Sequence, residues 1–388
     1  MIKLANWLKS ISPSAMQKSL NALKDDVISF SLGLPAPELF PIEQLKEALN
    51  CLENKDALQY APPLESLKSY IVEKMYERGA TCKENEVFLT TGAHQGMTLL
   101  TRLLLNPKST IILEEVVYPG FVQVVAPYQP NILTVKTDFK TGIDLEDLER
   151  TLKQGHNPAL LYMVTDGHNP LGLSLSREKR EHLANLASKY KLPIIEDDAY
   201  GFLFYDENIP SLRSFNSDFI LYVGSFSKIL APSLRVGWLI VPEYLVPKLS
   251  IIKESLDINM ATFSQRIVNS FIEKGYLEDH ILNIRAAYKL RRDQMNESLK
   301  NHLPDELSYT VPNSGFFIWG ECPKNIDVSL LFKNALEEKV SFIPGGGFAI
   351  SNIEKYKNCL RLSFSSSNTP KIEEGIKRFS KALEKSRL

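Results

Sequence analysis

The sequence lacks the features that mark several large classes of protein. Its 388 residues contain four cysteines, far apart and without a C-x-x-C pair, which argues against a disulfide framework or a zinc site. No stretch is long and apolar enough to span a bilayer, and Lys9 interrupts the N-terminal apolar residues too early for a signal peptide. We therefore expect a soluble protein of the cytoplasm, with reduced thiols and no membrane partner.

The chain also lacks an excess of charge of either sign. Its 45 Lys and Arg residues nearly balance 46 Asp and Glu residues, so no overall field favours nucleic acid as a partner. Internal repeats and low-complexity segments are missing too. The length favours two domains that share one site.

What the sequence does contain is an alternation of short β-rich runs with amphipathic helical patterns. The runs predicted to be strands are residues 87–91, 109–115, 131–136, 159–165, 192–197, 219–225 and 236–241. A helical pattern covers residues 177–191, between two of these runs. Such alternation predicts an α/β domain with a mainly parallel, buried sheet.

The rest of the chain has a different pattern. Residues 246–300 are predicted to be helical, and strand-like runs follow at 308–312, 315–320, 340–344 and 359–365 before a closing helix from Pro370. We expect a large domain over residues 50–255. A smaller α+β domain should comprise residues 256–388, completed by the N-terminal residues 1–49.

One lysine stands directly after a predicted strand, among polar neighbours. Lys228 has hydroxyls close by at Ser225 and Ser227, and an arginine, Arg235, seven residues later. A lysine amine forms an imine with a carbonyl group, while hydroxyls and a guanidinium bind phosphate. From these residues alone, a solvated loop lysine remains the alternative.

The segment TTGAHQ joins a predicted strand to an amphipathic helix that begins near Gly92, Ala93 and His94. The N–H groups at the start of a helix suit a phosphate. An ordinary strand–turn–helix explains the same pattern, so the segment is not decisive alone.

The segment IIEDDAY ends an apolar strand with three acids, which are costly to bury without a partner. Because side chains alternate along a strand, Asp197 faces opposite to Glu196 and Asp198. A protonated pyridine nitrogen would be such a partner. Spacing alone leaves open which face meets it.

These segments resemble the class I/II aminotransferases of pyridoxal-phosphate fold type I. The resemblance rests on S-x-S-K with P-x-x-R-x-G-W, on D-x-x-Y, on N-P-x-G and on the arginine of CLRLSFS, and it extends over nearly the whole chain. The segment GLPAPELFP is similar to the opening of the aminoadipate/kynurenine aminotransferase branch. The resemblance implies pyridoxal 5'-phosphate as cofactor and a homodimer with shared active sites.

The resemblance also implies catalytic roles. Lys228 would carry the cofactor as a Schiff base, Asp197 would pair with its ring nitrogen, and Tyr200 would contact its phenolic oxygen. The residues assigned to the cofactor are Tyr60, Gly92, Ala93, His94, Tyr118, Asn169, Asp197, Tyr200, Ser225, Ser227, Lys228 and Arg235. Those assigned to the substrate are Gly33, Asn169 and Arg361, of which Arg361 would grip the α-carboxylate in a two-pronged salt bridge.

The sequence departs from the family pattern at three places. Ala93 and His94 stand where serine and glutamine are usual, so a hydroxyl contact to phosphate is lost. The loop after Tyr60 is about two residues shorter than usual. The text Asp166-Gly167-His168 before Asn169 is unusual, and His168 is either a substrate contact or, as we favour, a local hydrogen-bonding residue.

The expected reaction is transfer of an amino group from an L-amino acid to a 2-oxo acid. A lyase, cyclase or oxidase on the same scaffold is the alternative, because function depends on the site rather than the fold. We expect neither a transcription regulator, since 32 residues precede Gly33, nor an inactive scaffold protein. The first arginine is Arg78, so an aromatic or aliphatic substrate is slightly favoured over a dicarboxylate.

Overall fold

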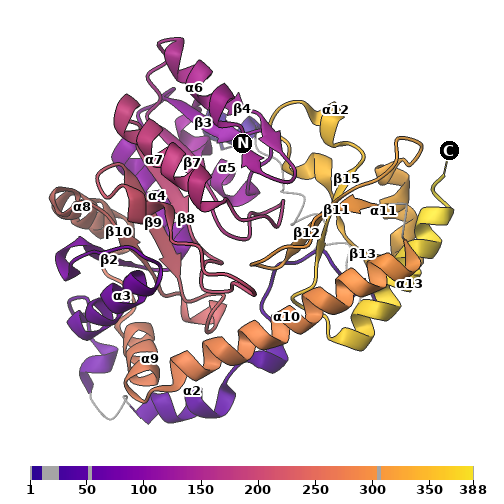
Figure 1. Ribbon diagram of the computed structural model, residues 1–388. Coiled ribbons are helices and arrows are strands. Elements are labelled where there is room, and N and C mark those ends of the chain that lie inside the picture. Colours follow the sequence, from indigo (N-terminus) through magenta and orange to yellow (C-terminus); the bar gives the residue numbers. More distant parts are fainter. Residues whose placement is uncertain (1, 11–25, 51–54, 304–306, 388) are drawn as a thin grey trace.

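The computed structural model describes residues 2–10, 26–50, 55–303 and 307–387. Its centre is a seven-stranded sheet in which β10 is antiparallel to both neighbours and the other pairings are parallel (Figure 1). In spatial order the strands are β2 (Val87–Thr90), β10 (Gly237–Ile240), β9 (Ile220–Ser225), β8 (Ile194–Asp197), β7 (Leu160–Met163), β3 (Thr110–Glu114) and β4 (Asn131–Val135). Each predicted strand is present, and the predicted mainly parallel sheet is confirmed.

Helices cover both faces of this sheet. One face packs on α4 (Ala93–Leu104), α5 (Pro119–Val125) and α8 (Val246–Asp257), the other on α6 (Leu145–Lys153) and α7 (Arg177–Tyr190). The alternation of strand side chains makes this possible, since Ile194 packs with the second group and Ile195 with the first. The short strands β5 (Thr137–Asp138) and β6 (Gly142–Ile143) form a separate hairpin.

The second part of the molecule is built on a four-stranded antiparallel sheet. Its order is β11 (Ser308–Tyr309), β12 (Phe317–Glu321), β15 (Cys359–Ser363) and β14 (Ile343–Pro344). Three helices accompany it, α11 (Val328–Glu337), α12 (Ile353–Tyr356) and α13 (Thr369–Glu384). The N-terminal β1 (Ile28–Ser29) pairs in parallel with β13 (Val340–Ser341), which attaches the N-terminal segment to this part.

A long helix joins the two parts. α10 (Tyr276–His302) runs from the side of α9 (Thr262–Glu273) and α2 (Ile42–Ala48) to α13 (Figure 1). The helices α8, α9 and α10 confirm the predicted helical content of residues 246–300, and α3 (Glu65–Glu77) lies earlier in the chain. The domain boundaries at residues 49 and 255 remain predictions.

The topology gathers several loops at one edge of the large sheet. Strands β7, β8 and β9 are parallel, and β2 has the same direction because β10 is antiparallel to both β2 and β9. The segments that follow their carboxyl ends therefore meet at this edge. Within the described parts of the chain, no helix is both long and apolar enough to cross a membrane, and no cluster of side chains could hold a metal ion.

Candidate active site

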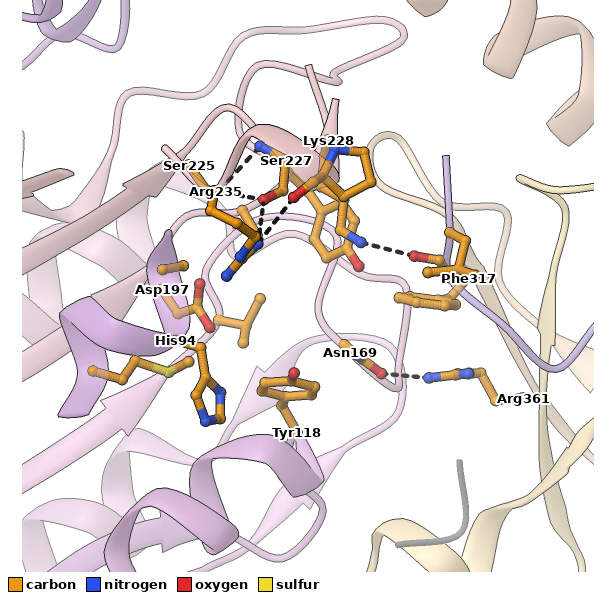
Figure 2. Close-up of a pocket in the computed structure, with 18 residues that line it drawn as sticks. His94, Tyr118, Asn169, Asp197, Ser225, Ser227, Lys228, Arg235, Phe317 and Arg361 are labelled. Carbon is orange, nitrogen blue, oxygen red and sulfur yellow. Dashed lines mark hydrogen bonds between the residues drawn. The ribbon is translucent and has the colours of Figure 1, made fainter. Parts of the chain in front are cut away.

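A cavity of about 250 Å3 at this edge brings most of the predicted site residues together (Figure 2). The predicted residues that line it are Gly33, Ala93, His94, Tyr118, Asn169, Asp197, Tyr200, Ser225, Ser227, Lys228, Arg235 and Arg361. Gly92 packs against the Arg235 guanidinium beside the cavity. Tyr60 lies outside it with 73% of its surface exposed, and its predicted contact with a partner subunit stays a prediction.

Lys228 lines the cavity and is half-buried. Its Nζ donates to the carbonyl oxygen of Gly33 at 2.9 Å. Burial lowers the pKa of Lys228 to about 8, against the opposing attraction of the Asp197 carboxylate and with the help of the Arg235 and Arg361 charges. A larger fraction of this lysine is thus a neutral, nucleophilic amine near neutral pH than of an exposed lysine.

Asp197 presents a carboxylate oxygen with no partner to the same cavity. The Tyr162 hydroxyl donates to Oδ2 at 2.7 Å, whereas the buried Oδ1 has no hydrogen-bond partner among the described residues. Burial raises the pKa of Asp197 to about 6, although the Tyr162 hydrogen bond lowers it. A buried carboxylate oxygen without a donor suits a ligand that brings an N–H or a positive charge.

One end of the cavity is a corner suited to phosphate. Arg235 Nη1 lies 3.4 Å from the Ser227 hydroxyl, and the Ser225 hydroxyl lies 3.0 Å from that of Ser227 (Figure 2). Gly92 has φ of +84°, and a Cβ there would lie 2.5 Å from an Arg235 nitrogen. Because α4 starts at Ala93, and Ala93 and His94 line the cavity, the free N–H groups of its first turn lie near this corner.

His94 belongs to the same corner and replaces the expected glutamine. Burial lowers the pKa of His94, and the charge of Arg235 lowers it further. The imidazole is therefore neutral at neutral pH before an anion binds.

Arg361 lies at the opposite end of the cavity, with no carboxylate partner in the described part of the chain. Its guanidinium lies between the rings of Phe317 and Phe348, with its carbon 4.1 Å and 4.8 Å from their centroids. It donates to Asn169 Oδ1 at 2.6 Å and to the Ser31 carbonyl. Burial lowers the pKa of Arg361 to about 9, and a buried cation of this kind is stabilised by an incoming anion such as an α-carboxylate.

The two predicted tyrosines complete the walls. Tyr118 follows β3 and stands at the start of α5, while Tyr200 follows β8 and packs edge-on against Phe316 and Phe317. Burial raises the pKa of both phenols, which keeps them protonated and able to donate a hydrogen bond.

Sequence reasoning missed three residues that shape the site. Tyr162 lies in an apolar run and resembled a core residue, yet its hydroxyl is the donor to Asp197. Phe317 and Phe348 enclose Arg361 from segments far from it in the chain. A hydroxyl in a strand that precedes the acidic strand was a usable signal for Tyr162, whereas the two phenylalanines gave none.

The arrangement can be compared with the needs of a phosphorylated pyridine aldehyde. Such a compound requires an amine of lowered pKa, an anion for its ring nitrogen and a site for its phosphate, and Lys228, Asp197 and Arg235 supply these. Arg361 remains for a second ligand with a carboxylate. The fold and the cavity thus define an enzyme of the pyridoxal-phosphate class.

Comparison with known proteins gives the family. The sequence model of the family of class I and II aminotransferases matches residues 25–379, and the chain belongs to this family. It is 34% identical over 370 residues to aromatic-amino-acid aminotransferase 1 of Thermococcus litoralis, covering 92% of this chain and 88% of that protein. The predicted aminotransferase family and activity and the pyridoxal-phosphate cofactor are confirmed.

Solved structures agree with this assignment. The kynurenine aminotransferase of Pyrococcus horikoshii superposes with a TM-score of 0.91 at 31% sequence identity. The match covers 98% of this chain and 97% of that chain. The α-aminoadipate aminotransferase LysN of Thermus thermophilus, in complex with N-(5'-phosphopyridoxyl)-L-leucine, has a TM-score of 0.89 at 32% identity with the same coverage. The predicted fold type is confirmed as well.

Proposed function

We propose that this enzyme transfers the amino group of an aromatic or aliphatic L-amino acid to a 2-oxo acid. The observation that carries the proposal is the pair of Lys228 and Arg361, which both line the cavity, with no carboxylate on the arginine. Among the described residues that line the cavity, the cations are Lys228, Arg235 and Arg361. Since each has a role in the reaction, none is left for an acidic substrate side chain.

Pyridoxal phosphate supplies an electron-accepting ring next to a carbon that exchanges an amino group. Asp197, with its partnerless Oδ1, would accept the ring N–H and keep that nitrogen protonated. Ser225, Ser227 and Arg235 would hold the phosphate, together with the N–H groups at the start of α4. Tyr118 would stack on the ring, which adds about 0.5–1.5 kcal/mol beyond burial.

The remaining residues would orient the substrate and move its proton. Arg361 would bind the α-carboxylate, with Gly33 at the same place, while Asn169 and Tyr200 donate to the cofactor's phenolic oxygen. The Lys228 amine would hold the cofactor covalently and, once freed by the substrate, would act as the general base that takes the proton from the substrate Cα.

Two further properties belong to the proposal. Exposed apolar side chains at Leu58, Tyr60 and Ile258 suit contact with a second copy of the chain, which supports the homodimer with shared sites. Cys82, Cys322 and Cys359 are buried, which suits the reducing cytoplasm, while Cys51 lies outside the described residues.

The test is an absorbance spectrum of the purified protein, repeated as single amino acids are added without any oxo acid. We expect a visible band that disappears in favour of the pyridoxamine form, with one equivalent of oxo acid released per site and the fastest response to aromatic or aliphatic amino acids. Continued turnover without an acceptor, with release of carbon dioxide, ammonia or peroxide, would instead establish a lyase or oxidase.

Two variants test whether Lys228 is the residue that binds the cofactor. Lys228→Arg keeps the positive charge but cannot form the imine, so the visible band should be lost. Lys357→Ala removes an exposed lysine that pairs with Glu354 and does not line the cavity, and should keep the band. A band that persists in Lys228→Arg would refute the role of Lys228.

A further inference from the structure

The segment Asp166-Gly167-His168 comes just before Asn169 and has no part in the proposed reaction. Asp166 and His168 are nevertheless 4% and 2% exposed, which is unusual for ionisable side chains in a loop. We propose that His168, clamped by Glu114, is a positioning residue that holds the Asn169 amide against Arg361. The inference rests on the proposed function, because the proposed reaction supplies the substrate carboxylate that Arg361 would bind.

The His168 ring is held on both of its nitrogen atoms. The Leu171 N–H donates to Nδ1 at 3.3 Å, so Nδ1 carries the lone pair and Nε2 carries the proton. Nε2 then donates to Glu114 Oε2 at 3.0 Å, in a pair whose side chains are 3% and 2% exposed. These two contacts fix both the tautomer and the orientation of the ring.

The backbone around His168 is equally constrained. Its N–H donates to the Leu173 carbonyl at 2.7 Å, and its carbonyl accepts from the Gly172 N–H at 2.6 Å. Glu114 is the last residue of β3, four residues before Tyr118. The pair therefore joins the segment that carries Asn169 to the segment that carries Tyr118.

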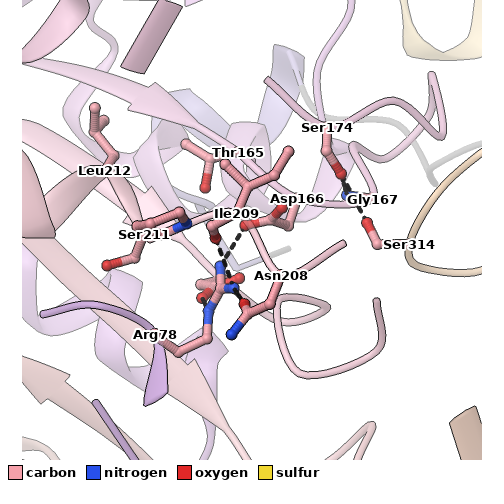
Figure 3. Close-up of polar contacts among 12 residues, drawn as sticks. Arg78, Thr165, Asp166, Gly167, Ser174, Asn208, Ile209, Ser211, Leu212 and Ser314 are labelled. Atoms are coloured by element: carbon pink, nitrogen blue, oxygen red, sulfur yellow. Dashed lines mark hydrogen bonds and ion pairs between the residues drawn. The ribbon is translucent and has the colours of Figure 1, made fainter. Parts of the chain in front are cut away.

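Asp166 fixes the other end of the segment. Arg78 Nη2 lies 2.5 Å from its Oδ2 (Figure 3), and Arg180 Nη2 lies 2.7 Å from its Oδ1, with both arginines fully buried. Arg78 also pairs with Asp198 at 3.1 Å, next to Asp197. Because both guanidinium groups are held by further contacts, Asp166 cannot move without breaking several hydrogen bonds.

Gly167 lies in the chain between Asp166 and His168 and packs closely against another segment. It has φ of +54°, and a Cβ there would lie 2.8 Å from Gly315 Cα. Its N–H donates to the Ser174 hydroxyl at 3.2 Å, which contacts the Ser314 hydroxyl at 2.8 Å (Figure 3). The backbone that leads to Asn169 is thus held by contacts from the residue after α3, from α7, from β3 and from the segment before β12.

The consequence for substrate binding follows from a single contact. Asn169 Oδ1 accepts from Arg361 Nη1 at 2.6 Å, and this hydrogen bond aims the guanidinium from which the α-carboxylate is bound. If the segment from Asp166 to Asn169 moves, the Arg361 guanidinium loses this orientation while its charge remains. The effect should therefore fall on binding more than on the proton transfer.

The test compares His168→Leu with His168→Gln, whose side-chain amide can still donate to Glu114. The measurement is single-turnover loss of the visible band against the concentration of L-phenylalanine, which separates the apparent dissociation constant from the maximal rate. We expect His168→Leu to raise the dissociation constant about tenfold, as for loss of one hydrogen bond to a charged group, with the maximal rate changed less than about threefold. His168→Gln should restore most of the affinity.

The Asn169→Ala background provides the control for how His168 acts. If His168 works through Asn169, then His168→Leu should leave the dissociation constant unchanged in that background. An equal loss in both backgrounds, or a lower melting temperature with unchanged affinity in His168→Leu, would overturn the inference. A wild-type protein with a visible band and no response to amino acids would refute the proposed function itself, and with it this inference.

Discussion

The lowered pKa of Lys228 predicts how cofactor attachment depends on pH. Only the neutral amine attacks the cofactor's aldehyde, forming a C=N bond with loss of water. With a pKa of about 8, about one tenth of Lys228 is neutral at pH 7, against about one in 3,000 for a lysine of ordinary pKa. The attachment rate should therefore be about 300-fold above that of an exposed amine at pH 7, and should rise with pH until it levels off above about pH 8.

The assay is stopped-flow absorbance. Protein freed of its cofactor is mixed with pyridoxal phosphate over a range from about pH 6.5 to about pH 10, and the appearance of the visible band is followed. Nα-acetyl-lysine amide under the same conditions provides the exposed-amine control. Lys228→Ala should give no band, which assigns the signal to this residue.

The variant Asp197→Asn tests the sign of the electrostatic effect. The Asp197 carboxylate favours the charged form of Lys228, so its removal should move the midpoint of the pH profile below about 8. A wild-type midpoint near that of the control amine would refute the desolvation argument. An upward shift in Asp197→Asn would refute the proposed coupling between the two residues.

Three other substitutions give distinct outcomes. Arg361→Met should raise the half-saturating amino acid concentration by about 100-fold, since a two-pronged charged contact is lost, yet calorimetry should show no loss of stability because a buried cation without a carboxylate partner is removed. Gly172→Ala should lower stability by more than about 2 kcal/mol in denaturant titration, because φ is +72° and a Cβ would lie 2.0 Å from the Phe317 carbonyl oxygen. Arg235→Gln should weaken pyridoxal phosphate binding by about 10- to 100-fold in equilibrium dialysis, with unchanged binding of pyridoxal, which lacks the phosphate.

The strands of the large sheet were predictable because their signals are local. The run at 219–225 is apolar and β-branched between polar turns, and it forms β9 (Ile220–Ser225). The antiparallel insertion of β10 and the pairing of Ile28 with Val340 depend on contacts between distant segments, which the sequence pattern does not contain. The run at 340–344 was treated as one strand, whereas the structure divides it between β13 and β14 in separate sheets.

The site was predictable where chemistry is concentrated in a short segment. Alternation put Asp197 opposite to Glu196 and Asp198 but left open which face meets the cavity. In the structure Asp197 faces the cavity, while Asp198 pairs with Arg78 and Glu196 accepts from the Thr165 hydroxyl. The Phe317 and Phe348 rings around Arg361 could not be predicted, because their proximity is a property of the folded chain.

The charges of the cavity explain why such a site stays incomplete without its ligands. Lys228, Arg235 and Arg361 contribute three positive charges to the lining and Asp197 one negative charge, an excess of two. The ligand groups complement these charges: the phosphate dianion and the α-carboxylate are negative where Arg235 and Arg361 lie, and the protonated ring nitrogen is positive where Asp197 lies. The lowered pKa values of Lys228 and Arg361 and the raised pKa of Asp197 are therefore consequences of the same fact, that charges meant for ligands are buried before those ligands arrive.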